Sequence, residues 1–281
     1  MRLRDLALSS SLKRRFLRED RLPTIFCAGC GIGTVLKYVL HAIDLAELDP
    51  KRLVWISGIG CSSRVTGYVK FDSLHTTHGR ALAFATGVKL ARPDLEVLVF
   101  AGDGDLAAIG GNHLFHAARR NLDVVVVVVN NFNYGMTGGQ TGPTTPTHCA
   151  TTSAPRGNFE RPTDLVALVA AAGANYAARW TFLDYVSGIN SLLKAFKKKR
   201  GFRLVEFVTP CPTYFGRLNG LKSLGDFSAW LRKNFALPSE EPAGRMRLGE
   251  LADRDEPGFV ESYFRHAMSA ISEELAGKSR P

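Results

Sequence analysis

The sequence predicts an α/β protein in which a parallel sheet is covered by helices on both faces and followed by a C-terminal extension. Short runs of apolar and β-branched residues alternate along the chain with longer runs of helical periodicity, the pattern of a helix-covered parallel sheet. The strand-like runs are apolar at successive positions, as in strands that are buried on both faces. A chain of 281 residues is long enough to bury such a sheet.

The predicted elements follow from these patterns in order. The first helix has apolar residues at helical spacing from Ile32 to Ile43 and ends before Asp49-Pro50. The four predicted strands cover residues 53–57, 97–101, 124–129 and 204–209. Further helices are predicted over 79–91, 106–120, 163–172, 182–200 and about 259–275. Gly173 and Gly201 are the expected stops of the helices over 163–172 and 182–200.

Two regions depart from the alternation. Residues 124–155 contain no Asp, Glu, Lys or Arg, and seven of residues 137–152 are Thr, which predicts a long ordered loop after the strand over 124–129. After Cys211 the pattern weakens and becomes rich in Pro, Gly and charge. We therefore expect a main domain over 1–211 and a C-terminal extension over 212–281.

Charge and hydropathy exclude several classes of protein. The net charge of +10 arises from two segments, 1–21 and 194–203, whose basic excesses are four and six. No aromatic residue interrupts the basic run at 197–200, so we expect no nucleic-acid partner. Apolar runs are too short for a transmembrane helix, and the basic, polar start does not resemble a secretory signal, so we expect a cytoplasmic protein without a membrane partner.

Four of the five cysteines occur where ligands are expected. Cys27 and Cys30 form a CxxC pair, and Cys61 and Cys211 each follow a predicted strand, where parallel sheets bind ligands. In a reducing compartment such thiols suit an iron–sulfur cluster. A structural zinc ion is one alternative, and another is that Cys61 and Cys211 are small buried apolar residues. Cys149 has no matching partner and is predicted not to be a ligand.

A second pattern indicates a magnesium and phosphate site. The turn at 102–104 is Gly-Asp-Gly between a strand and a helix, so its backbone can approach a phosphate at the start of that helix. Twenty-eight residues after Asp103, the valine-rich strand ends in Asn130-Asn131. Carboxylate and amide oxygens at neighbouring strand ends can hold Mg²⁺. The pair of motifs resembles that of enzymes that bind thiamine diphosphate through Mg²⁺.

Seven motifs extend the resemblance to one family. Between residue 23 and about residue 214 the chain contains, in order, CAGCGIG, SGIGCSSR, HTTHGRA, GDGD, IGGNH, NYGMTGGQ and CPT. This series resembles the β subunit of 2-oxoacid:ferredoxin oxidoreductases. Two departures are Ala28, where many relatives carry Pro, and a longer basic amino-terminal arm.

The resemblance implies a thiamine diphosphate-binding fold and a set of site residues. Cys27, Cys30, Cys61 and Cys211 match the ligands of a 4Fe–4S cluster. Asp103, Asn131 and the backbone carbonyl of Asn133 match the ligands of Mg²⁺. Positions matching contacts with thiamine diphosphate are Ile59, Gly60, Cys61, Ser62, His78, Gly104, Asp105, Gly135 and Met136. Arg64 matches a basic position expected to bind the substrate carboxylate, and the alternative is a surface arginine.

The implied activity is oxidative decarboxylation of a 2-oxoacid with coenzyme A to an acyl-CoA and CO₂, with electrons passing through the cluster to ferredoxin. The implied partner is an α subunit, in a heterodimer or a dimer of heterodimers. One alternative is half of a non-redox thiamine diphosphate decarboxylase, which has no use for four cysteines at ligand positions. Another is a basic binding module stabilised by zinc.

Overall fold

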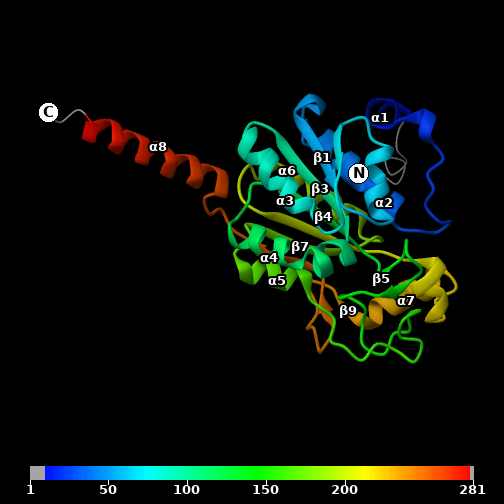
Figure 1. The fold of residues 1–281 in the computed structure, drawn as a ribbon. Helices are drawn as coiled ribbons and strands as arrows, with labels where there is room; N and C mark the ends of the chain where they lie inside the picture. Colours follow the sequence, from blue (N-terminus) through cyan, green and yellow to red (C-terminus); the bar gives the residue numbers. More distant parts are fainter. Residues whose placement is uncertain (1–9, 279–281) are drawn as a thin grey trace.

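The computed structural model describes residues 10–278, which form a seven-stranded sheet between two layers of helices (Figure 1). The strand order is β11-β7-β8-β4-β3-β1-β2, and only β11 is antiparallel to its neighbour. The strands are β1 (Leu53–Ser57), β2 (Asp72–His75), β3 (Glu96–Gly102), β4 (Val125–Asn130), β7 (Tyr176–Thr181), β8 (Arg203–Val208) and β11 (Gly249–Asp253). The four predicted strands are confirmed, with ends that differ by no more than one residue.

The helices cover both faces of the sheet, as predicted. Helices α2 (Ile32–Leu45) and α6 (Tyr185–Lys197) pack on one face; α3 (Ala81–Ala91), α4 (Gly111–Arg119) and α5 (Leu165–Ala172) pack on the other. Successive valines of β4 contribute alternately to these two cores, with Val125 and Val127 on one face and Val126 and Val128 on the other. This alternation explains why the strand is apolar at every position.

The structure confirms one predicted helix stop and corrects the ends of two other predicted helices. The segment predicted as one helix over 106–120 begins as a π-helical turn, Asp105–Ile109, before α4. Gly173 ends α5 in the left-handed conformation, with φ of 111°, as predicted. Helix α6 instead ends at Lys197, and Gly201, with φ of 77°, lies in the turn that leads into β8. The predicted stop at Gly201 is therefore wrong, and the helix ends three residues before the predicted position 200.

The C-terminal region contributes to the same body. It contains α7 (Leu224–Asn234), the short strands β9 (Phe235–Ala236) and β10 (Met246–Arg247), β11, and α8 (Phe259–Lys278). Side chains of α7 and β9 form a third apolar core together with Phe132 and Val208 of the main sheet region. Helix α8 extends away from the body (Figure 1). Among residues 10–278 no helix is long and apolar enough to cross a bilayer.

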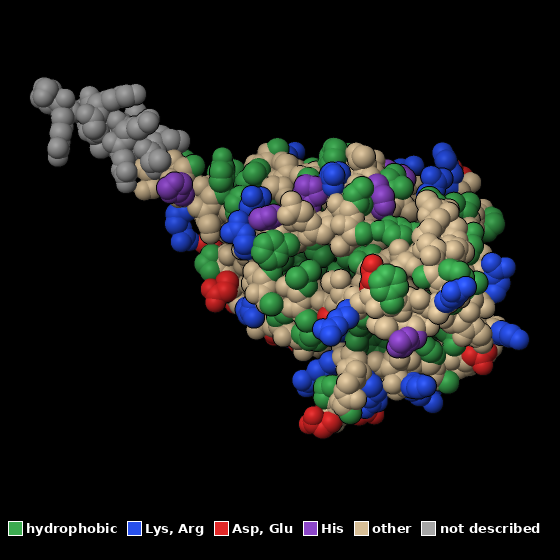
Figure 2. Space-filling model, turned by 60° about the horizontal axis from the view of Figure 1, so that its bottom comes forward, with side chains coloured by type: hydrophobic (Ala, Val, Ile, Leu, Met, Phe, Trp, Pro, Cys, Tyr) green, Lys and Arg blue, Asp and Glu red, His purple; other side chains and the backbone are tan. Residues whose placement is uncertain are grey.

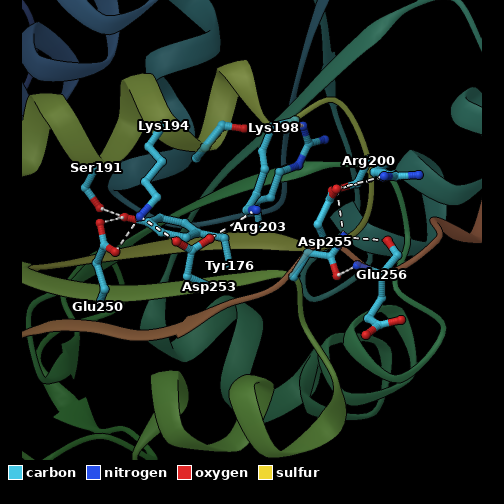
Figure 3. Close-up of polar contacts among 12 residues, drawn as sticks. Tyr176, Ser191, Lys194, Lys198, Arg200, Arg203, Glu250, Asp253, Asp255 and Glu256 are labelled. Carbon is cyan, nitrogen blue, oxygen red and sulfur yellow. Dashed lines mark hydrogen bonds and ion pairs between the residues drawn. The ribbon is translucent and has the colours of Figure 1, made fainter.

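The basic segment 194–203 is paired with the C-terminal strand (Figure 3). Lys194 lies 2.6 Å from Glu250 and 2.7 Å from Asp253. Arg200 lies 2.8 Å from Asp255, just beyond β11. This part of the charge excess therefore joins α6 and the turn after it to β11.

Candidate functional site

The carboxyl ends of β1, β3, β4 and β8 lie along one edge of the sheet, and the loops that follow them carry the predicted metal ligands other than Cys27 and Cys30, which lie in the loop before α2. Two neighbouring cavities open at this edge. We call the first the cysteine cavity and the second the cofactor cavity. They share four lining residues, namely Cys61, Asn131, Gly135 and Met136.

The cysteine cavity is lined by all four cysteines predicted as cluster ligands, Cys27, Cys30, Cys61 and Cys211. Arg64 lines it as well, whereas Cys149 does not. Burial raises the pKa of Cys30 and of Cys61 to about 11, and the neighbouring thiols act in the same direction. Among residues 10–278 no three His, Cys, Asp or Glu side chains are gathered as ligands of a single metal ion.

Two glycines allow the cysteine loops to approach one another. A Cβ on Gly31 would lie 2.5 Å from the Cβ of Thr209, so the CxxC loop packs directly on the segment that leads to Cys211. A Cβ on Gly135 would lie 3.4 Å from the Sγ of Cys61 and 3.9 Å from that of Cys211. The absence of a side chain at Gly135 therefore leaves the space between the two thiols and the cofactor cavity open.

The cofactor cavity is lined by every residue that the resemblance assigns to thiamine diphosphate or Mg²⁺. The former are Ile59, Gly60, Cys61, Ser62, His78, Gly104, Asp105, Gly135 and Met136, and the latter are Asp103, Asn131 and Asn133. Tyr134, which the sequence analysis did not single out, also lines it. A Cβ on Gly104 would lie 2.5 Å from the Tyr134 ring, so the Gly-Asp-Gly turn and this ring are in close contact.

Asp103 is only 1% exposed, and burial raises the pKa of its carboxyl group to about 6. Its hydrogen-bond donors are neutral: the Thr144 hydroxyl at 2.5 Å and the Asn131 backbone N–H at 3.4 Å. A buried carboxylate is stable in its charged form when a cation compensates it. The side chain therefore fits a metal ligand. Thr144 belongs to the threonine-rich loop, whose polarity without charge was the only sequence signal for this contact.

Asp105 connects the loops around the cavity. Its Oδ1 accepts hydrogen bonds from the backbone N–H groups of Gly79, at 2.7 Å, and Ile59, at 3.2 Å. The same oxygen lies 2.5 Å from Nδ1 of His78, and thus fixes the orientation of that ring. Its Oδ2 is buried without a hydrogen-bond partner in the described chain. Asp105 therefore holds His78 and the Ile59 backbone in place.

A buried polar network that the sequence did not reveal supports Asn131 from behind. Arg179 of β7 lies 2.5 Å from Glu206 of β8 and 2.5 Å from Asp164. Glu206 accepts a 2.8 Å hydrogen bond from the Asn130 side chain, whose Oδ1 in turn accepts one from the Phe132 backbone N–H at 3.1 Å. The network spans β7, β8 and β4 and ends at the loop that carries Asn131 and Asn133.

Phe132 lies between those two asparagines in a left-handed conformation, with φ of 64°. Such a conformation is unfavourable for a residue with a bulky side chain and persists only where the surroundings enforce it. The ring is buried and packs on Phe215, Trp230 and Phe235, with centroid distances of 5.1, 5.5 and 6.5 Å. The C-terminal region thus fixes the loop at the cofactor cavity.

Known proteins are similar to this chain in sequence and in fold. The family described as the C-terminal, thiamine pyrophosphate-binding domain of thiamine pyrophosphate enzymes matches residues 58–207. The KorB subunit of 2-oxoglutarate synthase from Methanothermobacter marburgensis is 49% identical over 94% of this chain and 93% of its own length. The β subunit of 2-oxoacid:ferredoxin oxidoreductase from Saccharolobus solfataricus is 41% identical over 67% of this chain and 62% of its own length.

The chain belongs to the family of 2-oxoacid:ferredoxin oxidoreductase β subunits. A solved structure of 2-oxoglutarate:ferredoxin oxidoreductase from Magnetococcus marinus, with 2-oxoglutarate, coenzyme A and succinyl-CoA bound, is also similar, with a TM-score of 0.83 and 29% identity over 96% of both chains. The predicted family, fold and enzyme class are confirmed. As a member of a thiamine pyrophosphate family and a β subunit, the protein is a thiamine diphosphate enzyme that works with a partner subunit.

Proposed function

We propose that this β subunit binds thiamine diphosphate through Mg²⁺ in the cofactor cavity and a 4Fe–4S cluster in the cysteine cavity. With an α subunit it oxidatively decarboxylates a 2-oxoacid with coenzyme A and passes the electrons to ferredoxin. The observation that carries this proposal is the wall shared by the two cavities. Cys61 and Gly135 line both, so a cofactor and a cluster bound there are neighbours.

The residues of the cofactor cavity fit a magnesium diphosphate. Asp103 supplies a charged oxygen, and Asn131 and Asn133 lie in the adjoining loop, held by Phe132 and the network behind Asn130. The Gly-Asp-Gly turn leaves backbone amides at the start of a helical segment, where negative charge is favoured. When bound, thiamine diphosphate supplies the nucleophilic carbon and electron sink for decarboxylation, and a cluster accepts the electrons one at a time.

The cysteine cavity favours a cluster over zinc. A four-cysteine zinc site requires all four sulfurs around one ion. In a 4Fe–4S cluster each thiolate binds a different iron, so the thiols surround a larger group. All four cysteines line the walls of one cavity, which suits a group larger than a single ion. The non-redox alternative leaves this cavity without a role.

The substrate that the relatives favour is 2-oxoglutarate, which appears in the names of the KorB relative and of the similar solved structure. We therefore propose 2-oxoglutarate as the preferred 2-oxoacid, with succinyl-CoA and CO₂ as products. Arg64 remains the candidate for binding a substrate carboxylate. Its side chain is exposed and lines the cysteine cavity rather than the cofactor cavity, so this role requires the side chain to reach past Cys61.

The surface fits a stable partner. Figure 2 shows hydrophobic side chains gathered across the middle of one face, with basic side chains around them. Ile59 and Met136, which line the cofactor cavity, are 40% and 46% exposed, and Phe84 and Ile109 are 47% and 49% exposed. Apolar surface of this kind marks a protein interface. We propose that an α subunit covers it in a cytoplasmic heterodimer or dimer of heterodimers.

The proposal is tested by co-expressing the chain with its α subunit without air and assaying 2-oxoglutarate. We expect coenzyme A-dependent reduction of ferredoxin and of methyl viologen, stimulated by thiamine diphosphate and Mg²⁺. Decarboxylation without reduction of either acceptor would favour the non-redox decarboxylase instead.

A further inference from the structure

A third cavity lies beside the cysteine cavity, and we call it the basic cavity. Three arginines, Arg18, Arg21 and Arg64, and the exposed His75 line it, together with the polar or small residues Thr66, Gly67, Tyr68 and Ser73. Its lining contains no Asp or Glu. Glu19, Asp20 and Asp72 are exposed neighbours in sequence of the lining residues, and Arg21 lies 3.4 Å from Asp20 in a weak surface pair, but none of the three acids lines the cavity. The cavity therefore concentrates positive charge.

The amino-terminal arm brings two of these arginines to the site. Phe16, at the end of α1 (Ser10–Phe16), is fully buried and packs on Phe71, with ring centroids 5.4 Å apart. The Arg18 backbone N–H donates a 2.8 Å hydrogen bond to the carbonyl oxygen of Tyr68. The arm is thus fixed against the turn that follows Cys61, with its guanidinium groups on the surface.

The same turn connects the basic cavity to the cysteine loops. The Tyr68 hydroxyl accepts a 2.9 Å hydrogen bond from the Ile25 backbone N–H, and its ring packs edge-on against Phe26, next to Cys27. Arg64, three residues after Cys61, lines both the basic and the cysteine cavities. The basic and cofactor cavities, in contrast, share no lining residue. The order of the three sites is therefore cofactor, cysteines, basic surface.

We propose that the basic cavity is the docking surface for an acidic electron-acceptor protein, an inference that rests on the proposed function. A coenzyme A thiol must reach the cofactor, whereas an electron acceptor needs to approach the cluster. The basic cavity adjoins the second site and not the first. Opposite charges at such a surface speed the encounter of two proteins and orient them. The basic arm thereby gains a function that composition alone did not show.

The test compares two acceptors in the reconstituted αβ enzyme, with Arg18→Glu/Arg21→Glu as the variant. Both residues are exposed, so the fold and the iron content should not change. At low ionic strength we expect kcat/KM for an acidic ferredoxin to fall about 10-fold or more, because two attractive charges become repulsive. The deficit should shrink at high salt, which screens these charges. Reduction of methyl viologen, a small cation, should stay within about twofold of wild type.

The matched control is Lys51→Glu/Lys197→Glu, which makes the same change in charge. These two exposed lysines lie before β1 and at the end of α6, away from the carboxyl ends of the strands. We expect a small effect on ferredoxin reduction. The neutral variant Arg18→Gln/Arg21→Gln should give an intermediate loss.

Five outcomes would overturn the inference. Unchanged ferredoxin kinetics in the arginine variant would show that the acceptor docks elsewhere. Equal losses with ferredoxin and viologen would place the arginines in the reaction itself. If the arginine variant has a raised KM for coenzyme A with both acceptors, the basic cavity binds coenzyme A. If the variant loses the α subunit on purification, the basic cavity contributes to subunit assembly. A wild-type enzyme that reduces neither acceptor contradicts the proposed function as well.

Discussion

Asp103 is the residue on which cofactor binding depends most, because its buried carboxylate faces only neutral donors. Asp103→Ala removes the charged magnesium ligand, so thiamine diphosphate affinity should fall on the order of 100-fold or more. Titration of the cofactor in the presence of Mg²⁺ measures the change. Asp94→Ala, at an exposed carboxylate paired with Arg92, is the control and should bind as wild type does. Unchanged affinity in Asp103→Ala would mean that the Gly-Asp-Gly turn is only a turn.

The cysteines allow a matched comparison. Cys211 is buried in the cysteine cavity, whereas the partly buried Cys149 packs against the third apolar core. Cys211→Ser should lose the cluster and electron transfer, and Cys149→Ser should keep both, as iron analysis and the visible thiolate-to-iron absorbance will show. If both variants retain full iron, Cys211 is not a ligand.

An Arg64 variant distinguishes between two carboxylates of the substrate that this side chain could bind. Arg64→Ala should lower kcat/KM by about 10- to 150-fold, the effect of losing a charge-assisted hydrogen bond. A loss greater for 2-oxoglutarate than for pyruvate would indicate that Arg64 binds the distal carboxylate, and equal losses would indicate the carboxylate common to both. A change below about threefold for both substrates would make Arg64 a surface residue.

At the scale of elements, α7 and β9 control the loop that carries Asn131 and Asn133. Trp230 of α7 packs on both Phe132 and Phe215, so Trp230→Leu should loosen the strained Phe132 and raise the Kd of magnesium thiamine diphosphate several-fold. The iron content should not change. Tyr263→Leu, an aromatic-to-leucine change on the exposed surface of α8, is the matched control. If the two variants bind the cofactor with equal affinity, the C-terminal region does not influence the cofactor cavity.

Strands β1, β3, β4 and β8 were predictable because burial on both faces makes them continuously apolar, whereas β2, β7 and β11 were not. β2 has all four side chains exposed, so it lacks that signal. β7 contains Arg179, whose buried charge is matched by Glu206 on the neighbouring strand and by Asp164 before α5. Pairing of that kind depends on tertiary structure, so the pattern of residues 176–181 did not predict this strand.

The candidate site was predictable where a motif is local and not where a contact crosses the fold. The cysteines, Asp103 and the asparagines follow strands within short motifs. The hydrogen bond of Thr144 to Asp103 joins residues 41 positions apart, and the hydrogen bond of Asn130 to Glu206 joins residues 76 positions apart. The sequence around one residue does not identify a hydrogen-bond partner that lies so far away in the chain. The domain boundary at residue 211 remains a prediction, although β11 lies in the main sheet.

For the molecule as a whole, the structure places two parts of the positive charge of residues 10–278. Lys194 and Arg200 are paired with acidic residues on and near β11, and Arg18 and Arg21 line the basic cavity beside the cysteine cavity. The apolar surface near the cofactor cavity completes the picture of a β subunit that works with an α subunit. The central claim about this subunit is that its cofactor and its cluster share the wall formed by Cys61 and Gly135.

One measurement tests this claim most directly. The αβ enzyme, purified without air, is analysed for metal and then mixed with 2-oxoglutarate while the visible absorbance of the cluster is followed. We expect about four irons per β chain, as a four-thiolate cluster requires, in addition to any iron that a separately purified α subunit contains. We also expect the visible absorbance of the cluster to bleach only when thiamine diphosphate is present. Stoichiometric zinc without iron in the β chain, or a cluster that the 2-oxoacid does not reduce, would contradict the account.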